Sequence, residues 1–516
     1  MLDDIIATFL SLFFAVTVDA PRISREINNN FRDQDEPFNA NDTSQGEYPS
    51  LVQEDFPSSS EYVSLSGVME NERSFGESLC KSLKATLTII LAVIPLVILG
   101  VILVYFDLRT TDLCFQLLTK SNDTLSFDVL RIRLIGDGIE IVILNLWFPV
   151  VLVILFGWRK FKSQYSLTVF IALLAALLYT LYLSFLLLYH FYDRSLWYRV
   201  PGNVIFVTAI LVESAIVVRK IRQRDPGISY SNCQIFTVIS CPWLLFYVIA
   251  LLYRYALVRW FITFESAFSR FIVAIMTPAL SLLLSVICRH MALWRSSQII
   301  SPERSFGLVY FIHTAGVILY RLLQADFKNI WWFIGLSIVS GTSGVLKAAT
   351  VGIREKIWSR IIPFWNKICC IRLRHLPGNT PRHRRLKADM NIQNILFDSN
   401  SLILIQAYIV LYQITSFEMS AWTVLKSSLI RIAIGISIEI VCNFISTFIH
   451  IHWRNIPIAR AWSKAWKRHM FANSVIIVCL VTYFTKPLLV VFQHRFHDNP
   501  AFGSGVYTIR NCTLSF

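Results

Sequence analysis

Charged side chains inside apolar segments are the residues of this chain whose types and spacing are able to do chemistry. Glu213 and Glu439 each interrupt a long apolar run, and Asn443 follows Glu439 by about one helical turn. A carboxylate in hydrocarbon is costly, so such residues usually line an ion or solute path or pair with a basic partner. The first interpretation makes Glu213, Glu439 and Asn443 the lining of that path.

The second interpretation is that the buried carboxylates form dry internal ion pairs. Arg431 precedes Glu439 by two turns and Lys486 lies in the last apolar segment, so basic partners are available. Asp137 and Glu140 share one face at the start of another segment, where we expect water to hydrate them. The sequence therefore leaves a secondary transporter with coupling carboxylates and a purely structural role both open.

His313 is a candidate base for a membrane-embedded transferase. It lies beside Thr314 in an apolar segment, without a motif that would orient the imidazole for proton transfer. The ten cysteines lack the spacing of zinc ligands, and no GxSxG, HExxH or P-loop pattern occurs. We therefore predict no metal and no cofactor, and we expect the protein not to be an enzyme.

The composition is typical of a membrane protein. Hydrophobic residues make up 55% of the 516 residues, and the mean hydropathy is +0.55. Helices of about 20 apolar residues cross hydrocarbon because they satisfy every backbone group internally. We predict an all-α, polytopic transmembrane bundle of about eleven helices. The predicted spans are 85–106, 137–157, 166–190, 203–218, 234–252, 271–288, 305–320, 331–347, 400–417, 427–448 and 472–492.

The loops between these spans alternate in basic charge. One set, with Lys81 and Lys84 before the first span, holds 28 Lys and Arg residues, whereas the opposite set holds 13. Basic loops stay in the cytoplasm, so we predict a cytoplasmic N-terminus and an extracellular C-terminus. The basic loops are 158–165, 219–230, 289–304, 347–395 and 449–471.

The charge distribution also defines the domain organisation. Residues 1–80 carry 15 acidic and 4 basic residues and read as a disordered cytoplasmic tail. Transmembrane helices one to eight occupy 81–346, a basic cytoplasmic loop 347–399, helices nine to eleven 400–492, and an extracellular tail 493–516. The net charge of +15 comes from residues beside the spans, which favours contact with lipid and not with nucleic acid.

The predicted topology assigns modification sites to the outside. Asn122 and Asn511 begin glycosylation sequons in extracellular segments. Cys114 and Cys512 are the extracellular cysteines, and we predict a disulfide between them, with two free thiols as the alternative. These features favour the plasma membrane.

Two further patterns concern packing and lipid. Residues 353–362 mix apolar and basic residues at helical spacing, which is typical of an interfacial helix, and a basic cluster follows at 382–387. For this cluster a role in setting topology is favoured over the binding of anionic lipid, and anionic lipid on the cytoplasmic face is an expected partner of the protein. Ser337, Gly341 and Gly344 are small residues that let a neighbouring helix approach closely.

The last seven spans, residues 234–492, resemble the insect gustatory and odorant receptor channels. That family's last helix carries Thr-Tyr, then apolar residues, then Gln-Phe. Here Thr482 and Tyr483 match in kind, while Gln493 comes four residues late and follows Phe492, and four extra spans precede the block. The resemblance implies cation conduction gated by a small molecule, in a homo-oligomer of four chains whose last helix lines the pore.

The leading function is therefore a receptor or channel that senses a small molecule and conducts cations. Its candidate pore or ligand path consists of Glu213, Glu439, Asn443, Thr482, Tyr483 and Gln493. The alternatives are the secondary transporter and the membrane-embedded transferase.

Overall fold

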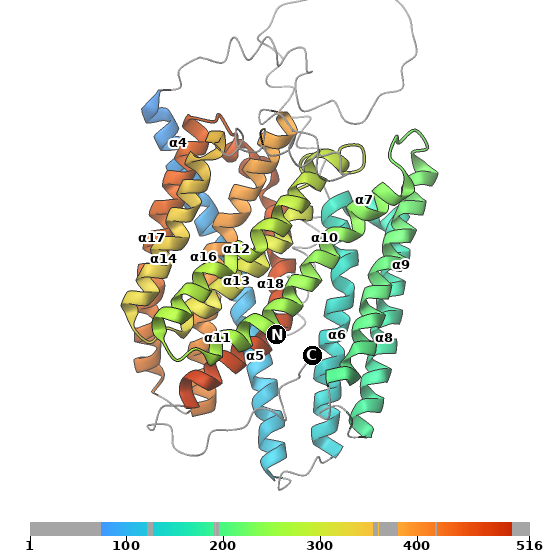
Figure 1. Ribbon diagram of the computed structural model, residues 1–516, viewed down its shortest axis with the longest axis vertical. Helices are drawn as coiled ribbons and strands as arrows, with labels where there is room; N and C mark the ends of the chain where they lie inside the picture. Colours follow the sequence, from blue (N-terminus) through green and yellow to red (C-terminus); the bar gives the residue numbers. More distant parts are fainter. Residues whose placement is uncertain are drawn as a thin grey trace, which may run out of the picture.

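The computed structural model describes residues 74–120, 127–189, 191, 196–353, 360, 380–417 and 420–497. Over these ranges the chain forms helices and no strands, so the all-α fold class is confirmed. Figure 1 shows long helices that run side by side between the two ends of the molecule.

Short connections join the helices in chain order. They are α4 (Phe75–Leu91), α5 (Val93–Lys120), α6 (Phe127–Phe156), α7 (Trp158–Lys160), η1 (Phe161–Tyr165), α8 (Ser166–Leu188), η2 (Leu196–Arg199), α9 (Val200–Arg224), α10 (Asn232–Leu252), η3 (Tyr253–Leu257), α11 (Val258–Thr263), α12 (Ala267–His290), η4 (Met291–Arg295), α13 (Gly307–Asp326), α14 (Ile330–Ala349), α16 (Pro381–Phe417), α17 (Ala421–His452) and α18 (Ile458–His497).

Eight helical stretches within the described residues are long and apolar enough to cross a membrane. The predicted spans 203–218, 271–288 and 472–492 also lie in helices, namely α9, α12 and α18, which are not among those eight. The structure therefore supports an integral membrane protein, while the count of eleven spans and the orientation of the termini stay predictions.

The outer helices turn apolar side chains away from the protein. Trp331 on α14 and Phe170 on α8 are 74% and 63% exposed, and Leu91 on α4 is 64% exposed. A surface of this kind is unfavourable in water but is solvated by lipid tails. The periphery of the bundle therefore has the character of a surface in contact with lipid.

Helix α13 occupies the centre of the bundle, and nearly all of its residues are buried. It packs against α10, α12, α16 and α18. Figure 1 places α4, α14 and α17 on one side of this centre and α6, α8 and α9 on the other. Glu213 on α9 and Glu439 on α17 therefore lie on opposite sides of the molecule.

Helix α16 begins at Pro381, well before the predicted start of the ninth span at 400. Residues 381–399 read as a loop because they contain a basic cluster, but proline is well suited to the first turn of a helix. Arg382 donates to the carbonyls of Ala292 and Ile300 at 3.0–3.1 Å. Arg382 belongs to the cluster for which lipid phosphate is one interpretation, and in the structure it bonds to protein carbonyls.

Two neighbouring arginines of the same cluster also bind protein groups. Arg384 donates to the carbonyl of Asn455, and Arg385 donates to Asp389 at 3.0 Å. Through Arg382 and Arg384 the cluster joins the start of α16 to η4, to the segment after η4 and to the connection between α17 and α18. Residues 354–359 and 361–379, where we predicted most of the interfacial helix, lie outside the described residues.

The two glycines of α14 differ in their surroundings. A Cβ atom at Gly341 would lie 2.6 Å from Sγ and 2.9 Å from Cβ of Cys442 on α17, whereas one at Gly344 would meet nothing within 4 Å. Of these two glycines, Gly341 is therefore the one at which α17 approaches α14 closely.

We expect Gly341→Leu to lower the free energy of unfolding by about 1–3 kcal/mol, because overpacking forces α14 and α17 apart. Thermal unfolding of the purified protein in detergent measures the effect as a lower Tm. Gly344→Leu, on the same helix and facing open space, is the control and should leave Tm close to that of the original chain. Equal effects of the two substitutions would contradict the close contact.

Candidate ligand-binding cavity

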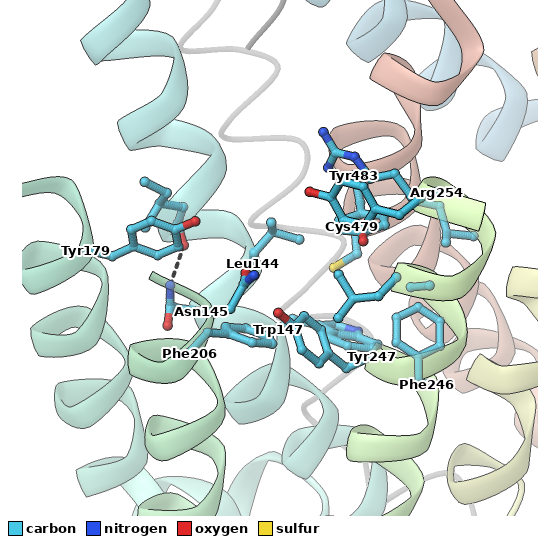
Figure 2. Close-up of a pocket in the computed structure, with 16 residues that line it drawn as sticks. Leu144, Asn145, Trp147, Tyr179, Phe206, Phe246, Tyr247, Arg254, Cys479 and Tyr483 are labelled. Atoms are coloured by element: carbon cyan, nitrogen blue, oxygen red, sulfur yellow. Dashed lines mark hydrogen bonds between the residues drawn. The ribbon is translucent and has the colours of Figure 1, made fainter. Parts of the chain in front are cut away.

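A cavity lies between α6, α8, α9, α10 and α18 (Figure 2). The free space inside it is about 50 Å³. Aromatic side chains from all five helices form much of its wall, which is typical of a site for a small organic molecule. These aromatic residues are Trp147, Tyr179, Phe206, Phe246, Tyr247 and Tyr483.

The π-helical turn η3 shapes one end of the cavity. It continues α10 directly, and its extra backbone residue re-aims the side chains that follow. Arg254 and Tyr255 belong to this turn and both line the cavity. Such turns are rare and are frequently found at functional sites.

Arg254 lies between two aromatic rings. Its guanidinium carbon is 5.5 Å from the ring centroid of Tyr255 and 5.5 Å from that of Tyr483 on α18. A cation is attracted to the face of an aromatic ring, and this attraction is stronger away from water. The contact ties the π-turn to the last helix across the cavity.

Five polar side chains of the wall are incompletely hydrogen-bonded. Among the described residues, the buried atoms without a hydrogen-bond partner are Asn145 Oδ1, Trp147 Nε1, Arg254 Nη1 and the hydroxyls of Tyr247 and Tyr483. Asn145 is held in place by a bond from its Nδ2 to the carbonyl of Ile141 at 2.8 Å, drawn as a dashed line in Figure 2. Buried polar atoms normally have partners, so these atoms mark places where a ligand is able to bond.

The structure brings one predicted site residue into the cavity. Tyr483 lines it, whereas the neighbouring Thr482 is half-buried and donates to the carbonyl of Val478 within its own helix at 2.7 Å. Gln493 also belongs to α18, but its side chain lies outside the described residues, as does that of Lys486.

Glu439 is part of a buried ion pair with Arg321. We predicted Arg431 or Lys486 as its partner and placed Arg321 in an extracellular loop, because the apolar run ends at Tyr320. Instead, α13 continues to Asp326 and carries Arg321 to a fully buried position. Arg431 donates to the carbonyls of Phe327 and Lys328 instead.

Further hydrogen bonds extend this pair into a network. Arg321 donates to Gln324 at 2.8 Å, and Gln324 donates to Ser337 on α14 at 2.6 Å. Ser399 on α16 donates to the second oxygen of Glu439 at 3.2 Å. The network joins α13, α14, α16 and α17, so the surroundings of Glu439 are those of a structural ion pair.

The other predicted carboxylates are buried as well. Glu213 is 1% exposed on α9, and its Oε2 atom has no hydrogen-bond partner among the described residues. Asp137 and Glu140, which we expected to be hydrated, are also buried, because α6 begins ten residues earlier and places them within the helix. Asn443 is half-buried on α17. Within the described part, Glu213 and Glu439 do not meet at one site.

The sequence analysis did not predict a polar network that lies between α13, α16 and α18. His469 Nε2 lies 3.2 Å from Asp389 Oδ1, and His469 Nδ1 lies 2.7 Å from Gln393 Nε2. Asn473 donates to Gln393 and accepts a bond of 2.8 Å from the Tyr310 hydroxyl. The spacing of four between residues 389 and 393, and between 469 and 473, is the signal that identifies the shared helix faces.

An ion pair closes this network at the basic end of the bundle. Arg468 donates to Glu303, in the segment before α13, at 2.9 Å. Partial burial alone would raise the pKa of Glu303, but the charge and hydrogen bond of Arg468, together with the charges of Arg385 and Arg304, lower this pKa below its ordinary value.

The remaining candidates give no second site. His313 on α13 is half-buried. Over the described residues, no group of three His, Cys, Asp or Glu residues is arranged to hold a metal ion. Asn122, Asn511 and Cys512 lie outside the described residues, as does the side chain of Cys114.

Comparisons of the chain with models of protein families, with curated proteins and with solved structures find no match. The fold and the cavity define the class of protein, an integral membrane protein with a helical bundle and an internal aromatic cavity.

We expect Glu439→Gln to lower the free energy of unfolding by about 3–5 kcal/mol, because it leaves the Arg321 charge buried without its partner. The measurement is thermal unfolding in detergent. The double variant Arg321→Met with Glu439→Leu removes both charges and should recover most of the stability. Glu213→Gln is the matched control, since that carboxylate forms no ion pair within the described part of the chain. An equal effect of both Glu→Gln changes would contradict the structural role of the pair.

Proposed function

We propose that the protein is a membrane receptor that binds a small molecule in the cavity and responds by conducting cations. One observation carries the proposal: the wall of an aromatic cavity inside the bundle has buried polar atoms without hydrogen-bond partners on α6, α10, η3 and α18. Several such atoms around one aromatic cavity favour a ligand that supplies the missing partners.

The wall indicates the chemistry of the ligand. Aromatic rings favour a planar apolar body, and Arg254 favours an acidic or carbonyl group through a charge-assisted hydrogen bond. Tyr247 donates or accepts and Asn145 Oδ1 accepts, so a second polar group on the ligand finds partners. A small aromatic acid that carries a hydroxyl or amine group fits this pattern.

Helix α18 is the element that connects binding to conduction in this proposal. Tyr483 contacts both the cavity and Arg254, and α18 packs against α5, α6, α13 and α16. The resemblance of Thr482 and Tyr483 to the last helix of the insect receptor channels supports a pore along α18 in an oligomer. Under the predicted topology, the cavity belongs to the extracellular half of a plasma-membrane glycoprotein.

A secondary transporter is the second candidate, and Glu213 favours it. This carboxyl group is buried on α9, the helix that also contributes Phe206 to the cavity. A carboxylate that takes up and releases an ion beside a solute cavity is the pattern of coupled transport.

We expect Tyr247→Phe to raise the ligand concentration for half-maximal current by about 2- to 12-fold, because one hydrogen bond to the ligand is lost. Currents are recorded from cells that express the protein while hydroxylated and amino-substituted aromatic acids are applied. Tyr105→Phe, which changes an exposed tyrosine of α5 away from the cavity, is the control and should leave the response unchanged. Normal responses in both variants would contradict ligand binding at Tyr247.

The same cells distinguish a channel from a transporter. A channel gives currents that reverse with the cation gradient and no accumulation of radiolabelled ligand. A transporter accumulates the ligand, and Glu213→Gln abolishes that accumulation. Accumulation without ligand-gated current would overturn the receptor proposal in favour of the second candidate.

A further inference from the structure

A second concave site lies on the outside of the bundle, between the end of α9 and the start of α10. It is an open groove of about 920 Å³, counting its open side. Ala215, Val218 and Phe236 form apolar walls, whereas Arg219 and Asn232 lie toward the connection between the two helices. The groove therefore combines an apolar length with a basic end.

The apolar part of the groove continues along the outer surface of α9. Ala215 and Val212 face outward, with Val212 41% exposed, and Val204 farther along the helix is 56% exposed. Figure 1 shows α9 at the outer edge of the bundle. An acyl chain that lies along this surface remains in contact with apolar side chains over its length.

The basic end carries more positive charge than nearby acids neutralise. Residues 219–225 contain four basic residues and one acidic residue, Asp225. Arg222 is used by the protein, because it donates to Asn232 at 2.9 Å and to the carbonyls of Ile228 and Tyr230. Arg219 is exposed at the groove, so its guanidinium is accessible to an external anion.

We propose that this groove binds one anionic phospholipid, with the phosphate at Arg219 and an acyl chain along Ala215 and Phe236. Guanidinium groups match phosphate oxygens in bidentate geometry. Basic residues at the end of a membrane helix attract anionic headgroups, and the loop 219–230 belongs to the set that we predict on the cytoplasmic side.

The shape and charge of the groove argue for a lipid over other occupants. A free phosphate ion would use only the basic end and would leave the apolar walls uncovered. A zwitterionic lipid would cover the walls but would gain less at Arg219, because its headgroup has no net charge. The coincidence of an apolar length with a charged end matches an anionic amphiphile.

Native mass spectrometry of the detergent-purified protein tests the proposal. The probes are phosphatidylglycerol and phosphatidylcholine with identical palmitoyl and oleoyl chains, and sn-glycerol 3-phosphate serves as a competitor without chains. We expect the first phosphatidylglycerol to bind more tightly than phosphatidylcholine, and an excess of glycerol 3-phosphate to leave it bound. Arg219→Gln should weaken phosphatidylglycerol binding about fivefold, since one basic residue near the headgroup is removed.

Two control variants make the test specific. Arg460→Gln removes an exposed arginine at the same end of the bundle on α18 and should leave lipid binding unchanged. Ala215→Trp fills the apolar part of the groove and should weaken both lipids, whereas Val441→Trp, at an exposed position of α17 on the other side of the bundle, should not. The proposal is overturned if Arg219→Gln and Arg460→Gln behave alike, if Ala215→Trp has no effect, or if glycerol 3-phosphate displaces the bound phosphatidylglycerol.

Discussion

The buried pairing of Arg321 with Glu439 is the interaction on which the centre of this bundle depends. A bundle surrounded by hydrocarbon has no water to solvate a charge, so a central helix with an arginine needs an internal counter-charge. Glu439 supplies it from α17, and Gln324 and Ser399 add further hydrogen bonds. This pairing accounts for a charged residue in the most buried of the eight apolar stretches.

The same constraint, that buried polar groups need partners inside the protein, governs the basic end of the bundle. It is also the basis on which the cavity is interpreted. Arg382 and Arg384 bond to backbone carbonyls, and Arg468 pairs with Glu303, so side chains that read as lipid contacts hold helices together. In the cavity, Asn145 and Tyr247 have buried atoms without hydrogen bonds. Such atoms cost free energy, and the proposed ligand would recover it by supplying the missing partners.

The sequence predicted the helical membrane class well, since runs of apolar residues determine it directly. It failed where charged or polar residues are buried inside the protein. Arg321 was predicted in a loop because hydropathy falls after Tyr320. In the structure it lies in α13 and pairs with Glu439, 118 positions later in the chain. The start of α16 was missed for the same reason. The cavity depends on side chains from five helices, and Tyr483 was found only through its resemblance to a receptor motif.

Helices α9 and α10 link the two concave sites. Phe206 and Tyr247 line the internal cavity, while Arg219 and Phe236 line the outer groove on the same helix pair. The buried Glu213 lies on α9 between Phe206 and Arg219. In the proposals made above, an occupant that changed the spacing of α9 and α10 at one site would alter the other, and such coupling acts equally in both directions. The proposed lipid and the proposed ligand would then be linked through the contact of α9 with α10.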